Sequence, residues 1–251
     1  MKNEPLVSIV TPLYNSANFL PETLDSVLNQ TYKNWEMFII DDCSKDNGLE
    51  IALEYAKKDS RINVVPLKKN SGAACSRNVG IAKAKGDFIA FVDSDDVWMP
   101  QKLEKQLNFM LKNNYYLTYT SYQRIDEEGN KGKIIRPPKK VWYKKMLFQN
   151  YIGLSTAMIN VKEFGKKFFI PHIRREDYAY WLKILQNDLE YAYLYDDIVI
   201  NYRVRKGSLS SNKIKLVRYQ LFLYNQVIGL NYIKSLFYTL NNIALKVLKI
   251  K

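Results

Sequence analysis

Residues 62–96 read INVVPLKKNSGAACSRNVGIAKAKGDFIAFVDSDD, with two short apolar runs separated by a segment of helical length. The runs Ile62–Val65 and Phe88–Val92 are rich in β-branched and aromatic residues, which are typical of strands. Between them, Ala73–Lys83 has the length and pattern of a helix. A strand, a helix and a second strand in this order predict a βαβ unit, whose strands lie parallel in one sheet.

The same alternation extends from this unit in both directions. At its N-terminal end, LVSIVT predicts the first strand, and Pro21 suits the first turn of the helix that follows. The expected series is strand Leu6–Thr11, helix Pro21–Asn29, strand Glu36–Ile40, helix Gly48–Lys57, strand Ile62–Val65, helix Ala73–Lys83, strand Phe88–Val92, helix Pro100–Asn113 and strand Tyr116–Ser121. Such alternation predicts an α/β fold with a doubly wound, mostly parallel central sheet.

The regular alternation ends at residues 126–140, DEEGNKGKIIRPPKK, where glycine, paired prolines and dense charge predict an exposed loop or sheet edge. Beyond this segment the pattern is less regular, and the tail from Ile214 onward looks helical and basic. The expected elements are strand Tyr151–Asn160, helix Glu176–Gln186, strand Ala192–Leu194 and strand Ile198–Val204. We expect one domain at residues 1–212 and a helical extension over 213–251.

Composition narrows the class of protein. A chain of 251 residues, 47% hydrophobic and 25% charged, suits one enzyme-sized unit and excludes a disordered or fibrous protein. It has no run of about 18 apolar residues, which argues against a membrane-spanning protein. Cys43 and Cys75 are too few for a disulfide scaffold, and the first residues lack the apolar stretch of a secretory signal. We expect a protein of the reducing cytoplasm.

Polar residues follow the expected strands at four places. In a doubly wound sheet, ligands bind beyond the carboxyl ends of the strands, so these residues are candidates for one binding rim. They are Thr11, Pro12, Tyr14 and Asn15 after the first strand, Asp41 and Asp42 after the second, Asn70–Asn78 after the third, and Asp93, Asp95 and Asp96 after the fourth.

The fourth of these places, FVDSDD, holds three carboxylates within four residues. Mutual repulsion makes this arrangement costly unless a cation or hydrogen-bond donors neutralise it. Hard oxygen ligands favour Mg²⁺ or Mn²⁺, which one or two carboxylates and substrate phosphates typically hold. The alternative is a solvated acidic turn or a cap for the helix near Pro100.

Two other sets have equally plain alternatives. Asp42 suits recognition of the imide N–H of a uracil-type base with Tyr14 near the ring, but aspartate is also an ordinary turn residue. Arg77 follows Gly72 in NSGAACSRNVG, where it is a cation for phosphate or the structural partner of a nearby carboxylate.

The C-terminal half adds a candidate base and a basic segment. Glu176 and Asp177 open a helix, either as favourable charges at its N-terminus or as a general base. Residues 202–210, YRVRKGSLS, suit closure over a phosphate or an ordinary charged loop. The lone His172 supports neither a zinc site nor a Ser-His-Asp triad.

The order of these features resembles that of a family 2 glycosyltransferase. The resemblance covers about residues 6–212 and rests on VSIVTPLYN, FIIDDCS, KNSGAACSRNVGIAKAKGDFIAFVDSDDVWMP, RRED and YRVRKGSLS. More narrowly, bacterial glycosyltransferases of teichuronic acid and related surface-polysaccharide synthesis are similar in KLEKQLNFML, PHIRREDYAYWLKIL and YRVRKGSLSSNK.

The resemblance implies a GT-A fold, a nucleotide-diphosphate-sugar donor such as a UDP-sugar, Mn²⁺ or Mg²⁺, and single displacement with inversion. Residues 1–125 would then bind the donor and 126–212 the acceptor. Asp177 would be the base, and metal ligands would come from Asp93, Asp95 and Asp96. Donor contacts would come from Thr11, Pro12, Tyr14, Asn15, Asp42, Arg77, Asp93, Ser94, Asp95, Arg203 and Arg205.

Two departures refine what the resemblance implies. Many relatives carry a histidine where this chain has Arg205, so a third protein ligand for the metal is in doubt, and an arginine contact to the leaving diphosphate is a reasonable substitute. The Q-x-x-R-W signature of processive synthases is absent from the sequence, which favours addition of a single sugar.

Charge is distributed unevenly along the chain. Of 25 acidic residues, 18 precede Gly129, whereas 130–162 and 213–251 contain none and hold eight and seven basic residues. The tail also has an approximately helical apolar series: Leu216, Leu223, Val227, Leu230, Leu236, Leu240, Leu245 and Leu248. This pattern fits an interfacial helix on an anionic leaflet, or equally a helix packed on the domain or on a dimer partner.

Together these features favour an enzyme at the cytoplasmic membrane face that acts on a glycan or lipid-diphosphate-linked acceptor, with a homodimer as a candidate assembly. A nucleotidyltransferase would usually begin with a glycine-rich phosphate loop, which LVSIVTPLYN does not provide. A basic nucleic-acid-binding protein fits the net charge of +13, but an Asp-rich rim would repel a polyanion, so we expect no nucleic acid partner. An inactive relative that serves as an assembly partner is the remaining alternative.

Overall fold

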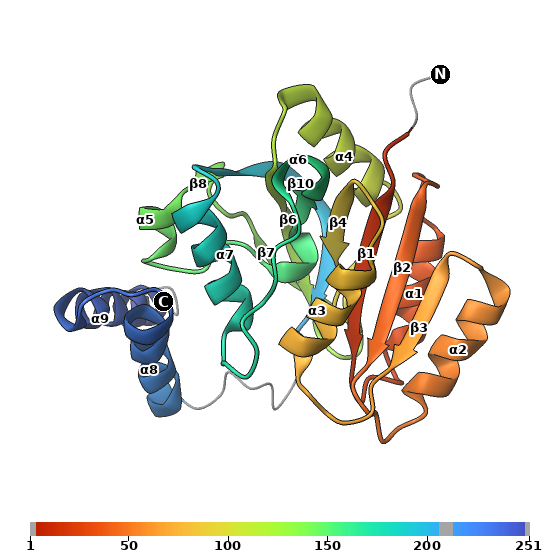
Figure 1. Ribbon diagram of the computed structural model, residues 1–251, viewed down its shortest axis with the longest axis horizontal. Coiled ribbons are helices and arrows are strands. Elements are labelled where there is room, and N and C mark those ends of the chain that lie inside the picture. Colours follow the sequence, from red (N-terminus) through yellow and green to blue (C-terminus); the bar gives the residue numbers. More distant parts are fainter. Residues whose placement is uncertain (1–3, 206–212, 249–251) are drawn as a thin grey trace.

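The computed structural model describes residues 4–205 and 213–248, which form a central sheet with helices on both faces (Figure 1). The strand order in the sheet is β3-β2-β1-β4-β9-β6-β10-β5, with β7 paired to β6 and β8 to β10. The strands are β1 Val7–Leu13, β2 Trp35–Asp41, β3 Ile62–Pro66, β4 Phe88–Phe91, β5 Val97–Trp98, β6 Leu117–Ile125, β7 Lys131–Ile135, β8 Lys140–Val141, β9 Met158–Asn160 and β10 Ala192–Arg203.

The long strands of the sheet run parallel. β1 pairs in parallel with both β2 and β4, β2 pairs in parallel with β3, and β6 pairs in parallel with β10. The antiparallel pairings involve the shorter strands β5, β7, β8 and β9. The chain moves from β1 out to β3 and then returns to β4 on the other side of β1, which makes the β1–β4 junction a topological switch point.

Alternating side chains of the strands build one core on each face of the sheet. Val7 and Ile9 of β1 pack in a cluster that includes residues of α1, α2 and α4, whereas Val10 packs in a cluster that includes residues of α3 and α7. The helices are α1 Leu20–Leu28, α2 Gly48–Lys58, α3 Ala73–Lys83, α4 Lys102–Asn113, α5 Tyr143–Met146, α6 Val161–Phe164, α7 Glu176–Asn187, α8 Lys213–Phe222 and α9 Tyr232–Leu248.

The predicted α/β fold with C-terminal helices is confirmed, and the differences lie in the second half. The strand predicted over Tyr151–Asn160 is mostly irregular chain and a 3₁₀ turn at Leu154–Thr156, with only β9 as strand. The two strands predicted between Ala192 and Val204 are one strand, β10, whose register against β6 shifts twice. Periodicity alone cannot distinguish a bulge in one strand from a break between two.

The predicted edge and tail also have counterparts. Residues 126–140 contain β7, an exposed strand at the side of β6. The tail forms α8 and α9, with a π-helical turn at Leu223–Val227 between them. Residues 207–210 and the side chains of Leu216 and Leu248 lie outside the described residues. Within 4–205 and 213–248, no helix has the length and hydropathy needed to cross a membrane.

Candidate functional site

The carboxyl ends of β1 and β2 and the loop before α3 form one side of a rim. The Asp42 backbone N–H donates to the Leu13 carbonyl at 2.8 Å, and the Asp42 carboxylate accepts the N–H groups of Ser71 at 2.7 Å and Gly72 at 2.8 Å. Gly72 has φ +86°, a conformation that glycine adopts without strain. Asp42 therefore fixes the loop that leads into α3.

The residues after β1 divide between the interior and the surface. Thr11 is fully buried, and its hydroxyl is without a hydrogen-bond partner among the described residues. Tyr14 is exposed, and Asn15, in the left-handed region, accepts the N–H of Lys45 through its side chain at 2.8 Å. Tyr14 and Asp42 thus lie in adjacent segments of one rim, whereas a ligand would reach Thr11 only after a rearrangement.

The acidic turn after β4 has one buried and two partly exposed carboxylates. Asp96 is buried, and its carboxylate accepts the Ser155 hydroxyl and, at 2.8 Å, the backbone N–H of Arg203. Burial, together with the charges of Asp93 and Asp95, raises the pKa of Asp96 well above its usual range. Asp96 is therefore an interior anchor of the turn, while Asp93 and Asp95 reach the rim.

Asp95 carries negative charge that the protein balances only in part. Burial, and next the charge of Asp93, raises the pKa of Asp95 to about 6. Among the described residues, Arg205 pairs with Asp95, with Nη1 3.6 Å from Oδ2, and its side chain is partly exposed. A backbone hydrogen bond and the charges of Arg205 and Arg203 offset the negative charge of Asp95, but they do not outweigh burial and the charge of Asp93.

Arg203 lies behind this turn and is fully engaged. Its Nε donates to the carbonyl of Asp95 at 2.9 Å, its Nη1 donates to the carbonyl of Asp126 at 3.0 Å, and its Nη2 pairs with Glu22. Its side chain is only 2% exposed. Arg203 therefore ties β10 to the acidic turn and to α1, and Arg205 is the arginine of this pair with access to a ligand.

Arg77 connects the acidic turn to the start of α7. Its Nη2 lies 2.7 Å from Oδ1 of Asp93 and its Nη1 lies 3.0 Å from Oε1 of Glu176, while the side chain is buried. The predicted alternative of a structural carboxylate partner is what the structure shows for Arg77. The bridge brings the residue after Glu176, Asp177, to the same side of the molecule as Asp93.

Asp177 is the carboxylate at the first turn of α7. Its Oδ2 accepts the Nδ2–H of Asn150 at 2.8 Å. Burial, and next the charge of Glu176, raises the pKa of Asp177 above its usual value, against the opposing charge of Arg175. A carboxylate with a raised pKa and a neutral hydrogen-bond partner is suited to accepting a proton from a hydroxyl.

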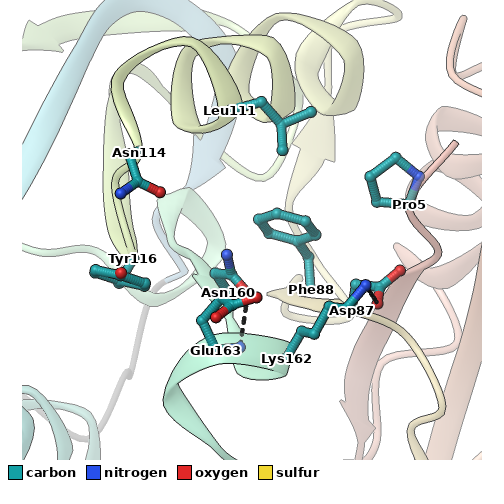
Figure 2. Close-up of a pocket in the computed structure, with 9 residues that line it drawn as sticks. All are labelled: Pro5, Asp87, Phe88, Leu111, Asn114, Tyr116, Asn160, Lys162 and Glu163. Carbon is teal, nitrogen blue, oxygen red and sulfur yellow. Dashed lines mark hydrogen bonds and ion pairs between the residues drawn. The ribbon is translucent and has the colours of Figure 1, made fainter. Parts of the chain in front are cut away.

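A separate hollow of about 690 Å³ lies at the opposite end of the strands. Figure 2 shows its lining side chains, which come from the segment before β1, from the start of β4 and the residue before it, from α4 and the segment between α4 and β6, and from β9 and α6. Lys162 pairs with Asp87 at 3.3 Å, and Asn160 caps the N–H of Glu163. Phe88, the first residue of β4, lines it, so this hollow is not part of the rim.

Comparison with known proteins identifies the family. The family model for glycosyl transferase family 2 matches residues 8–174. A putative teichuronic acid biosynthesis glycosyltransferase of Bacillus subtilis (strain 168), TuaG, is 39% identical over 92% of each chain. The chain belongs to glycosyl transferase family 2. It is therefore a glycosyltransferase rather than a nucleotidyltransferase or a nucleic-acid-binding protein.

Other relatives of this family 2 glycosyltransferase extend the comparison. An Escherichia coli protein named UDP-Glc:alpha-D-GlcNAc-diphosphoundecaprenol beta-1,3-glucosyltransferase, WfgD, is 37% identical over 97% of this chain and 94% of its own. The structure of S. aureus TarS with UDP-GlcNAc matches with a TM-score of 0.72 at 21% identity, over 94% of this chain and 71% of that one. This structural likeness confirms the predicted GT-A fold.

The carboxylates of this family 2 glycosyltransferase fit a divalent metal in part. The described residues contain no cluster of three or more His, Cys, Asp or Glu side chains arranged to hold a metal. Asp93 and Asp95 reach the rim. The pKa of Asp95 is raised by burial and in part by the negative charge of Asp93, and a bound cation would offset this repulsion. Two carboxylates and the phosphates of a substrate are a sufficient donor set for Mg²⁺ or Mn²⁺. Asp96 does not fit, because both its oxygens have partners in the interior.

Sequence reasoning missed three residues that support the site. Ser155 accepts the N–H of Asp93 at 3.1 Å and donates to Asp96, Asn150 donates to Asp177, and Glu22 pairs with Arg203. Ser155 lies in the segment predicted as a strand, Asn150 directly precedes that segment, and Glu22 lies in the first turn of a helix. Nothing in their spacing marks them, because each acts across more than 25 residues of sequence.

Proposed function

We propose that the protein transfers one sugar from a UDP-sugar to a lipid-diphosphate-linked glycan in bacterial surface-polysaccharide synthesis. The names of two relatives support this proposal: WfgD is named for a UDP-glucose donor and a diphosphoundecaprenol-linked acceptor, and TuaG for teichuronic acid biosynthesis. The two relatives align with 92% and 97% of this chain, so the alignments extend beyond the proposed donor-binding residues 1–125. A lipid-linked acceptor would place the enzyme at the cytoplasmic face of the membrane.

One observation carries the proposal: Arg77 bridges Asp93 and Glu176. This bridge holds the acidic turn after β4 and the first turn of α7 together, although their sequence positions are 83 residues apart. A donor diphosphate beside Asp93 and Asp95 would then face an acceptor hydroxyl beside Asp177. The sugar would lie between the two, as a single displacement requires.

In the proposed mechanism, Asp177 accepts the proton of the acceptor hydroxyl as its oxygen attacks the anomeric carbon. The new glycosidic C–O bond forms as the bond from the anomeric carbon to the donor phosphate oxygen breaks, and the nucleoside diphosphate leaves with that electron pair. Because attack and departure occur on opposite faces, the configuration inverts. Mn²⁺ or Mg²⁺, held by Asp93 and Asp95, would supply Lewis-acid stabilisation of the diphosphate when bound.

Arg205 is the protein group that we assign to the leaving diphosphate. Its guanidinium is partly exposed, and its contacts with the described residues are a 3.6 Å contact to Asp95, a 3.4 Å contact to Ser16 and a position over the ring of Phe19, 5.1 Å from the ring centroid. A guanidinium can make two parallel hydrogen bonds to phosphate oxygens, and such charge-assisted bonds strengthen as negative charge develops. Arg203 is not available for this role, since the carbonyls of Asp95 and Asp126 and the carboxylate of Glu22 occupy its guanidinium.

Calorimetric titration with UDP, GDP and dTDP, each with and without Mn²⁺, tests the donor site. We expect UDP to bind in a metal-dependent way and Asp95→Ala to abolish that binding. Asp197→Ala removes a partly exposed aspartate that pairs with Lys105 elsewhere on the surface, so it is the matched control and should bind as the native chain does. Binding of GDP or dTDP instead would replace the proposed donor, and metal-independent binding would remove the metal from the proposal.

A further inference from the structure

Helix α9 buries polar side chains and exposes apolar ones, which is the reverse of an ordinary surface helix. The residues that it buries are polar: Ser235, Thr239 and Asn242 are all less than 5% exposed. Large apolar side chains lie on its outside, where Ile233 is 79%, Phe237 53% and Leu240 57% exposed. A surface helix in water normally shows the opposite arrangement.

A hydrogen bond and ring contacts to the body of the protein hold α9 in this orientation. Nδ2 of Asn242 donates to the carbonyl of Phe148 at 2.9 Å, whereas the hydroxyl of Thr239 bonds within the helix, to the carbonyl of Ser235 at 2.7 Å. The ring of Tyr238 packs edge-on against Phe148, with centroids 5.1 Å apart. Rotating the helix to bury its apolar side would break the contact of Asn242 with the body of the protein.

The exposed apolar side chains form a continuous stripe. Residues three or four apart on a helix are neighbours, so Ile233, Leu236, Phe237 and Leu240 lie on one face, which we call the α9 apolar face. This face is on the part of the molecule formed by α8 and α9, beside α5 and α7 and away from the strands β1 to β4 (Figure 1). A contiguous apolar surface of this kind marks an interaction site.

The apolar series predicted for the tail contains both buried and exposed side chains. Leu223 is buried and packs in the core cluster with Tyr224 and the residues of α7, whereas Leu236 and Leu240 face outward. Packing on the domain therefore accounts for the first part of the apolar series. Among the described residues the α9 apolar face stays largely exposed, although the ring of Phe237 also touches the edge of Phe148, with centroids 6.4 Å apart.

The charge of the segment that carries this face favours an anionic surface as the partner. Residues 213–251 contain seven basic residues and no acidic one, and Lys234 and Arg218 are exposed. A second copy docked through the same face would bring two acid-free, basic surfaces together with no opposite charge between them. An anionic lipid headgroup layer over an acyl region matches both the basic flanks and the apolar stripe.

We propose that the α9 apolar face docks the enzyme on an anionic membrane, with Ile233, Phe237 and Leu240 inserted below the headgroups. The proposal deepens the proposed function, on which it rests for a lipid-linked acceptor. The helix packs on Phe148, two residues before Asn150, and Asn150 holds Asp177. Docking through α9 therefore brings the acceptor side of the rim toward the lipid surface.

Vesicle flotation of the full-length chain tests this proposal. The vesicles are phosphatidylcholine with or without phosphatidylglycerol, and no donor or acceptor is added. The test variant combines Ile233→Gln, Phe237→Gln and Leu240→Gln, because glutamine keeps helix propensity while it removes the apolar surface. The matched control combines Leu53→Gln, Leu111→Gln and Ile134→Gln, which change exposed apolar side chains on α2, α4 and β7, each 42–50% exposed.

We expect the native chain and the control to float with phosphatidylglycerol vesicles, and the test variant to bind at least about tenfold more weakly. Circular dichroism and UDP titration establish that each variant is folded, and they separate failure of docking from failure of the proposed function. Absence of native-chain flotation would overturn the proposal. A native dimer that becomes monomeric in the test variant, with no vesicle binding, would assign the face to a second copy instead.

Discussion

Two neighbouring aspartate–arginine pairs at the acidic turn differ in burial and in the number of hydrogen bonds they make. The inner pair, Asp96 and Arg203, is buried, and its polar atoms bond to Asp95 of the same turn and to groups of three other segments, at Glu22, Asp126 and Ser155. The outer pair, Asp95 and Arg205, is partly exposed, with its charged atoms 3.6 Å apart. The comparison teaches that satisfaction of hydrogen bonds, rather than residue type, separates groups that hold the fold from groups free to bind a ligand.

The largest effect on this comparison should come from Arg203→Ala. Its removal leaves Glu22 and the carbonyls of Asp95 and Asp126 without their donor, so we expect a loss of about 3–5 kcal/mol in the free energy of unfolding. Urea denaturation measures the loss. Arg205→Ala is the matched variant, and it should change stability by less than about 0.5 kcal/mol while it weakens donor turnover. Equal destabilisation by the two substitutions would contradict the division into inner and outer pairs.

The next largest effect should be on the rate, from Asp177→Asn. Asparagine has the shape of aspartate but cannot accept the proton, so we expect kcat to fall about 10²–10³-fold, which is about 3–4 kcal/mol. Because burial raises the pKa of Asp177, loss of its charge should leave thermal stability unchanged or improved. Steady-state kinetics and a melting curve on one preparation give both values. A variant that keeps its rate would exclude Asp177 as the base.

The sequence predicted the features of this molecule that depend on neighbouring residues, and it did not predict those that depend on contacts between residues far apart in the chain. Local periodicity was sufficient for the parallel strands and the helices between β1 and α4, because each of those strands is a short apolar run bounded by turn residues, but it did not predict the two-residue strand β5. It also brought Asp42, Asp93 and Asp95 to one rim, since parallel strands end at the same edge. The strand predicted over Tyr151–Asn160 was wrong over most of its length. That segment forms a 3₁₀ turn at Leu154–Thr156, where the hydroxyl of Ser155 accepts the backbone N–H of Asp93.

The sequence could not show which of the charged residues in the rim are buried and which are exposed, and the reason is physical. Asp95 and Asp96 are adjacent in an acidic turn, and only the partners at Ser155 and Arg203 show which of them is buried. Likewise, the sequence alone does not distinguish Arg203 from Arg205. The structure distinguishes them, because the guanidinium of Arg203 pairs with Glu22. Contacts of this kind join residues that are 59 and 107 positions apart, and no local pattern records them.

A smaller effect than these is expected from Ser155→Ala. The change removes the donor to the Asp96 carboxylate and the acceptor of the Asp93 N–H, so we expect a destabilisation of about 1–3 kcal/mol in chemical denaturation. Ser76→Ala is the control, because Ser76 is also fully buried but its hydroxyl only shares the Gly72 carbonyl within α3, and we expect about 0–1 kcal/mol there. Equal costs for the two serines would argue that Ser155 is a packing residue and no anchor of the turn.

The smallest effects should be shifts in the acidic limb of the pH–rate profile, because Asp177 must be ionised to act. Its pKa is raised, so activity should fall as pH decreases through a value above that of an ordinary aspartate. Glu176→Gln removes a neighbouring negative charge and lowers this pKa, which moves the limb to lower pH. Asn150→Ala removes a hydrogen bond to the ionised form, which moves the limb to higher pH.

Each of these shifts should be less than about one pH unit, which is about 1.4 kcal/mol. Asp95, with a pKa of about 6, also titrates in this range, but neither substitution touches it directly. Opposite displacements of the limb by the two variants therefore identify Asp177 as the titrating group. Displacements in one direction, or none, would assign the limb to Asp95 and so to donor binding, which would move the pH dependence from the base to the outer pair.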